Sequence, residues 1–74
     1  MNKQRRKKLE IVFEKLCKIE EILEEVKEEE EESYENLPYG IKYSEKGDEM
    51  QSYIEMLKEV EGYIADAKSV IEQI

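Results

Sequence analysis

The chain has 74 residues, which is enough for one small domain spanning 1–74 and too few for two. Charged residues make up 43% of the chain and hydrophobic residues 39%, with one Pro and three Gly, a composition typical of long amphipathic helices. It has no His, a single Cys and no Gly-rich phosphate-binding loop. These features argue against an enzyme, and we expect no catalytic residue, metal site or cofactor.

Charge is unevenly distributed along the chain, whose formal net charge is −8. Residues 1–8 carry five positive charges, whereas the other 66 residues hold 7 basic and 20 acidic side chains, a net of −13. The basic segment could contact phosphate, but no aromatic residue interrupts it and the acidic remainder repels nucleic acid. We therefore keep nucleic-acid binding as an alternative only, beside the hypothesis that the acidic surface imitates nucleic acid.

The first predicted helix covers about residues 3–35. Apolar side chains alternate at spacings of three and four, as in the a and d positions of a heptad repeat, and neither Gly nor Pro interrupts them. Phe13 and Ile22 widen this apolar face on either side. The a and d residues are Leu9, Val12, Leu16, Ile19, Leu23 and Val26.

A connector of about residues 36–43 follows this helix. Pro38 lacks an amide donor and restricts Leu37 away from helical geometry, so the helix should end near Glu35 or Asn36. Gly40 permits a positive φ for the turn.

The second predicted helix covers about residues 44–74. Ser44 is a suitable N-cap, and Asp48 with Gln51 three residues later is a rival capping box; we prefer the start at Ser44. Met56, Tyr63 and Val70 occupy g positions, which makes the apolar face wider than one helical partner needs. The a and d residues are Met50, Tyr53, Leu57, Val60, Ile64, Ala67, Ile71 and Ile74.

Two helices of similar length joined by a short connector predict an all-α fold, an antiparallel hairpin. A single hairpin leaves part of each apolar face in water, so we expect a homodimer that forms a four-helix bundle, with a tetramer left open. The basic run 3–8 and the acidic run 28–32 favour antiparallel pairing of the first helix with its own copy. The candidates for self-association are Phe13, Ile22, Met56, Tyr63 and Val70.

The connector region carries the candidates for binding a foreign protein, which are Tyr34, Tyr39, Ile41 and Tyr43. Tyrosine is favoured in interfaces because it offers a large contact area at little entropic cost. The alternative is that these rings close the end of the bundle, and the sequence leaves both readings open.

Cys17 is the only cysteine, and a lone thiol without an internal partner predicts a reducing, intracellular setting. The basic N-terminal residues are followed by Glu10 and Glu14, which break the apolar run that a signal peptide requires. We expect neither a signal peptide nor a membrane span.

The order of several motifs resembles a group of very short, uncharacterised helical proteins encoded by phages and mobile elements of Gram-positive bacteria. The motifs are RRKKLE, an acidic helix, YENLP and SEKGDEM opening a second heptad helix. The resemblance covers nearly the whole chain and implies a location in the bacterial cytoplasm. It implies no functional residues, because no activity is assigned to the group.

The leading functional hypothesis is a non-enzymatic protein-binding module, which could inhibit a host defence or nucleic-acid-processing protein. The first alternative is a structural or accessory phage protein that only self-associates. The second is a nucleic-acid binder that acts through the basic N-terminal arm.

Overall fold

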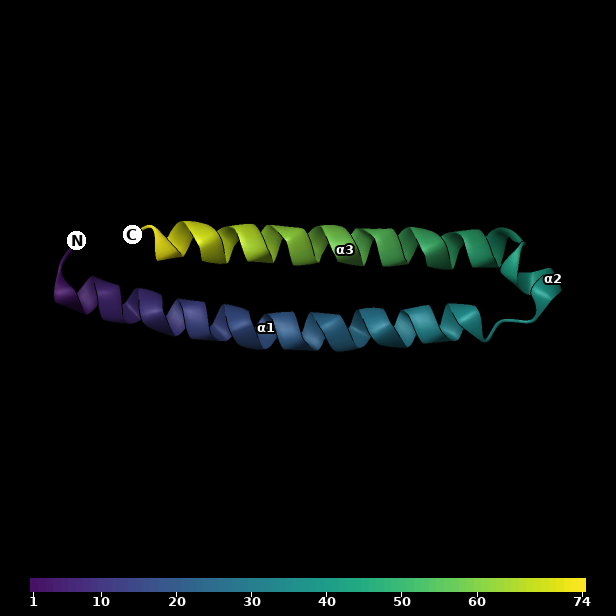
Figure 1. Cartoon of the computed structure of the whole chain (residues 1–74), viewed down its shortest axis with the longest axis horizontal. Helices are drawn as coiled ribbons and strands as arrows, with labels where there is room; N and C mark the ends of the chain where they lie inside the picture. The colour runs from purple at the N-terminus through teal and green to yellow at the C-terminus, as the bar shows by residue number, and fades with distance from the viewer.

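The computed structural model describes residues 1–74 and consists of three helices without strands. Helix α1 spans Lys3–Glu35, the short helix α2 spans Tyr39–Lys42, and helix α3 spans Glu45–Glu72. Helices α1 and α3 lie side by side in opposite directions, and α2 lies at the turn between them (Figure 1). The predicted all-α hairpin is thus confirmed.

Both ends of α1 are fixed by local hydrogen bonds. The side chain of Asn2 caps the N-terminus, where its Oδ1 accepts a hydrogen bond from the Arg5 amide at 2.9 Å. At the other end, the Asn36 amide donates to the Glu32 carbonyl at 3.0 Å, just before Leu37 and Pro38 leave the helix. The helix ends where proline would otherwise break its hydrogen-bond ladder.

The connector holds one helical turn that the sequence did not predict. The carbonyl of Pro38 accepts hydrogen bonds from the amides of Ile41 and Lys42, both at 2.9 Å, which forms α2. Gly40 lies inside this turn, and no glycine of the chain has a positive φ. The positive φ that Gly40 permits is not used, because the chain reverses through a helical turn instead of a tight loop.

Helix α3 begins at Glu45 after Ser44, the start preferred from the sequence. The Ser44 side chain makes no capping bond to α3; its Oγ donates to the Ile41 carbonyl at 2.5 Å and so ties α3 to α2. Gly47 is buried in the first turn of α3. A Cβ at this position would collide with the backbone of Lys42, so Gly47 lets α2 approach α3 closely.

We expect Gly47→Ala to destabilise the hairpin by about 1–3 kcal/mol, since an extra carbon against fixed backbone forces the connector to move. Gly62→Ala is the matched control, because nothing lies within 4 Å of its added Cβ. That control should stabilise the protein by about 0.5–1 kcal/mol through higher helix propensity. Thermal unfolding followed by circular dichroism measures both changes. Equal effects of the two substitutions would contradict the close approach at Gly47.

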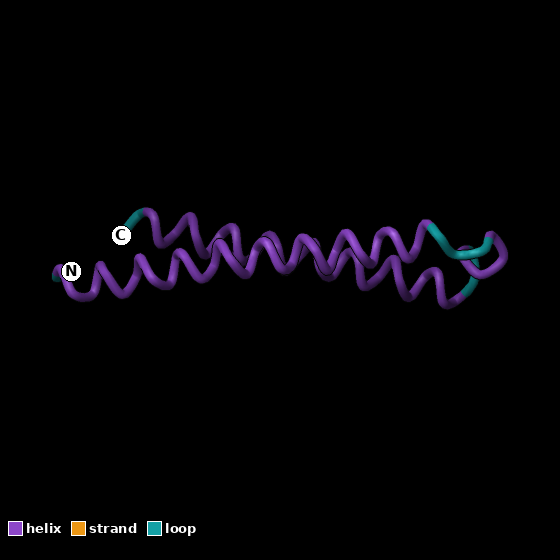
Figure 2. Tube along the Cα trace, turned by 90° about the horizontal axis from the view of Figure 1, so that it is seen from below, coloured by secondary structure: helices purple, strands orange, loops and turns teal.

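The molecule is a rod with a very small interior. Its Cα atoms extend over 59 × 15 × 12 Å, and the two long helices cross at a shallow angle near the middle of the rod (Figure 2). Ile54 is the only buried hydrophobic residue, at 8% exposure. One layer of side chains between two helices cannot enclose more, so large apolar side chains remain on the outside.

Candidate functional site

The seam between α1 and α3 alternates apolar and charged side chains. At the position after each predicted d residue of α1, the side chain turns inward, as Phe13 does after Val12 and Glu20 does after Ile19. The same shift occurs in α3, where Ile54 follows Tyr53. The inner seam comprises Leu9, Phe13, Leu16, Glu20, Leu23, Lys27, Glu30, Tyr34, Met50, Ile54, Leu57, Glu61, Ile64, Lys68 and Ile71, all half-buried or buried.

Two ion pairs cross this seam. Lys68 Nζ donates to Glu20 Oε1 at 2.5 Å and lies 5.1 Å from the centroid of the Phe13 ring. Lys27 lies 3.0 Å from Glu61 and is about four-fifths shielded from solvent. Because these charges lie between the helices and pair across the seam, they favour one register of the hairpin.

The seam lysines should make the hairpin sensitive to alkaline pH. The hydrogen bond to Glu61 raises the pKa of Lys27, and that to Glu20, with Cys17 beside it, raises the pKa of Lys68. Their stabilising effect is complete below the unfolded lysine pKa of about 10.4 and is lost as pH rises through the higher folded values. The hydrogen bond to Glu49 likewise raises the pKa of Tyr53, so its ionisation above about pH 10 also favours unfolding.

We therefore expect the melting temperature to fall above about pH 10. The double variant Lys27→Met/Lys68→Met should be less stable at neutral pH, and its melting temperature should fall less between pH 9 and 11. The control Lys18→Met/Lys58→Met removes two exposed lysines and should keep the decline of the parent. A melting temperature of the parent that stays flat to pH 11 would contradict a stabilising role for the seam pairs.

Because the residue after each d position faces the seam, both helices are rotated about their own axes relative to the packing that the heptads predict. This rotation leaves one apolar face uncovered. Val12, Ile19 and Val26 are 41–44% exposed, although they are d positions of the predicted repeat. Further exposed side chains continue this face around both helices. We call the set the apolar stripe; it consists of Val12, Ile19, Ile22, Val26, Tyr53, Met56, Val60, Tyr63, Val70 and Ile74.

The two halves of the apolar stripe turn to the same side of the hairpin. In each helix the d residue directly precedes an inward-facing residue, as Ile19 precedes Glu20 and Val60 precedes Glu61. One residue is a rotation of about 100° in the same sense in both helices. Because α1 and α3 run in opposite directions, equal rotations bring the two rows to one face.

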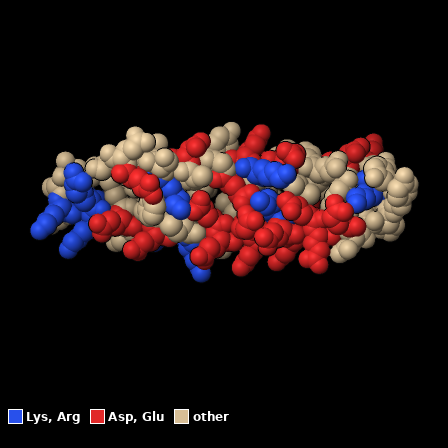
Figure 3. All heavy atoms as spheres, in the orientation of Figure 1, with Lys and Arg blue, Asp and Glu red and all other residues tan.

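The opposite side of the hairpin is acidic. Glu28 follows Val26 by two residues, a rotation of about 200°, so it points away from the apolar stripe. Acidic side chains gather along α1 from the middle of the rod toward the connector, whereas basic ones gather at the open end (Figure 3). One side therefore favours apolar contacts and the other favours a basic partner.

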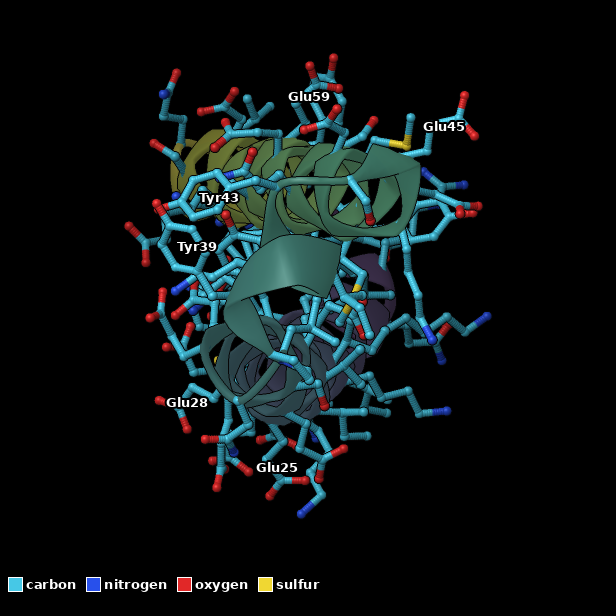
Figure 4. All side chains as sticks on the ribbon, turned by 90° about the vertical axis from the view of Figure 1, so that its right-hand side faces the viewer. Glu25, Glu28, Tyr39, Tyr43, Glu45 and Glu59 are labelled. Atoms are coloured by element: carbon cyan, nitrogen blue, oxygen red, sulfur yellow. The ribbon has the colours of Figure 1, made fainter.

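The closed end presents a pair of tyrosines whose rings contact each other at a tilt of 57°. The rings of Tyr39 and Tyr43 lie 4.9 Å apart, and their side chains are 81% and 68% exposed. Viewed along the rod, both rings lie on the same side as Glu28 (Figure 4). Ile41 is 42% exposed, but it lies two residues after Tyr39 in α2, about 200° around the turn, and so faces away from the two rings. We call Tyr39 and Tyr43 the aromatic patch.

Tyr34 and Phe13, two further sequence candidates, lie away from these surfaces. Tyr34 is half-buried, and Lys42 Nζ lies 5.0 Å from the centroid of its ring. Lys42 is held there by Glu35 at 2.9 Å, whose hydrogen bond raises the lysine pKa. Phe13 lines an open groove of about 450 Å³ at the open end, whereas the other self-association candidates, Ile22, Met56, Tyr63 and Val70, lie on the apolar stripe.

Three further features bear on function, namely metal ligands, membrane spans and similarity to known proteins. No group of three or more Cys, Asp and Glu side chains is arranged to hold a metal ion, and Cys17 is a free, half-buried thiol. None of the helices has a stretch that is long and apolar enough to cross a membrane. Comparisons of the chain with protein families, with curated proteins and with solved structures find no match.

Proposed function

We propose that this protein is a non-enzymatic module that binds another protein through the aromatic patch. The observation that carries the proposal is the exposure of Tyr39 and Tyr43 together, with their rings in contact, at the closed end of the hairpin. Exposed aromatic rings that pack on each other are already ordered, so little side-chain entropy is lost when a partner covers them. By contrast, the third tyrosine of this region, Tyr34, is half-buried, with Lys42 Nζ 5.0 Å from its ring centroid.

The surroundings of the patch support a partner with a basic surface. Glu28 lies on the same side of the rod, and Glu31 and Glu35 follow it along this row of α1. Their carboxylates would steer positively charged surfaces toward the tyrosines. A basic groove of a host defence or nucleic-acid-processing protein has this chemistry, and we propose such a protein as the target.

The test is affinity capture from a bacterial lysate with three forms of the protein. The triple variant Tyr39→Ser/Ile41→Ser/Tyr43→Ser should keep its helical content and lose the protein captured by the parent. Ile11→Ser is the matched control, because Ile11 is 52% exposed and lies outside the patch; this variant should capture the same protein as the parent. Capture that survives the triple substitution would place the binding surface elsewhere.

A further inference from the structure

We propose that the apolar stripe is covered by a second copy of the same chain, turned so that the connectors of the two copies lie at opposite ends. The apolar stripe lies on the face away from the aromatic patch, so dimerisation is separate from binding of a foreign protein. A two-fold axis can pair two such faces in two orientations, with the connectors at the same end or at opposite ends.

The size of the apolar stripe fits a stable dimer interface. From Tyr53 to Ile74 it runs along α3 for about 32 Å at about 1.5 Å per residue. Across two helices, each about 10 Å wide, such a face covers about 600 Å² on each copy. The two copies together would bury about 1,200 Å², the lower bound of stable protein interfaces. A foreign helix lying along the stripe would cover only part of this width.

The charge distribution selects the orientation. With both connectors at one end, α1 of each copy would lie against α3 of the other, and the two basic ends would share one end of the bundle while the two acidic runs 28–32 lay at the same level. With the connectors at opposite ends, the basic end of each copy lies against the acidic run of the other. Because like charges in contact are unfavourable and opposite charges attract, the second arrangement is selected.

This orientation also gives a matched register. A two-fold axis through Ile19 places Val12 opposite Val26 of the second copy, since each lies seven residues from the axis. It places Lys8 opposite Glu30 of the second copy, eleven residues from the axis on either side. In α3, small Ala67 meets Val60 of the second copy, so that large side chains are not forced against each other.

The same geometry accounts for the unequal sides of each hairpin. The apolar stripes would form the centre of a four-helix bundle, and the half-buried a residues Leu16 and Ile64 would close it from both sides. The aromatic patch and the row with Glu28 would lie on the outer surface, one set at each end of the dimer. Dimerisation and binding of a foreign protein therefore use separate surfaces.

Disulfide trapping tests this arrangement. In a Cys17→Ser background, the variant Ile19→Cys places its thiol on the proposed two-fold axis, where Cα atoms of the two copies come within the about 4.4–6.8 Å that a disulfide needs. Oxidation at micromolar concentration should convert most of the chain to a covalent dimer. The control is Glu21→Cys in the same background, because Glu21 lies toward the acidic side. On non-reducing denaturing electrophoresis this variant should stay monomeric.

Two outcomes would overturn the proposal. The first is the absence of a covalent dimer with Ile19→Cys while circular dichroism shows the helical content of the parent. The second is a mixed disulfide between the separate variants Ile19→Cys and Ala67→Cys that forms in place of the symmetric one. That product would mean that α1 lies against α3 of the second copy, with both connectors at the same end.

Discussion

Replacing Ile54 with Asp is expected to unfold the protein. Ile54 is the most shielded apolar side chain of the inner seam, at 8% exposure, and it lies nine residues after the start of α3 at Glu45. An unpaired carboxylate buried there costs about 3–5 kcal/mol. A domain of this length has a total stability of about 4–11 kcal/mol, at about 0.05–0.15 per residue, so one substitution removes a large share of it.

The helical signal in circular dichroism at 25 °C measures this loss, and Ser52→Asp provides the control. Ser52 precedes Ile54 by two residues, is exposed, and lies in the same part of α3. The control should keep the helical signal and melt within a few degrees of the parent. An Ile54→Asp variant that melted as the parent does would show that the inner seam is not the core of the fold.

Reversing two basic side chains at the open end is expected to weaken the dimer by between about 30-fold and several hundred-fold. Arg5 and Lys8 precede Val12 by seven and four residues, so they continue the apolar stripe. In the proposed dimer they face the acidic run of the second copy. Each reversal replaces attraction with repulsion, and four such contacts at about 0.5–1 kcal/mol each give about 2–4 kcal/mol.

The matched control for Arg5→Glu/Lys8→Glu is Lys18→Glu/Lys58→Glu, which changes the net charge by the same amount. Lys18 and Lys58 are exposed and pair only with neighbours on their own helices. Sedimentation equilibrium at several protein concentrations gives the dissociation constants. If both double variants weakened the dimer equally, the effect would come from total charge, and opposite-end pairing would be contradicted.

The helices and their connection could be predicted from the sequence because local chemistry determines them. Pro38 cannot continue the hydrogen-bond ladder of α1, and the apolar spacing on both sides of it has the helical period. Only one antiparallel pairing joins two such helices through so short a connector. The single turn α2 could not be foreseen, because its hydrogen bonds to the Pro38 carbonyl depend on how α3 packs against it.

The rotation of the two helices about their axes could not be predicted from the sequence. Hydropathy assigns Glu20 and Lys68 to the surface, yet the structure pairs them inside the seam. Their pairing, together with the close approach at Gly47, turns Ile19 and Val60 outward. A heptad pattern alone says that a face is apolar, and it does not say which part of that face meets the helix of the same chain and which part meets another.

The candidate binding residues separated for a similar reason. The sequence grouped Tyr34 with Tyr39 and Tyr43 because they are close along the chain. In the structure the end of α1 turns Tyr34 inward beneath Lys42, whereas α2 carries the other two outward. The exposure of a ring depends on the rotation of the helix that carries it. The positions of the aromatic residues along the chain do not determine this rotation.

The central claim is that a second copy covers the apolar stripe, and the mass of the particle in solution tests it most directly. We expect sedimentation equilibrium at micromolar concentration and moderate salt to give twice the chain mass of 8.9 kDa, with dissociation and loss of helical signal occurring together on dilution. A particle of 8.9 kDa that kept its full helical signal would contradict the claim, since the apolar stripe would then remain open to water.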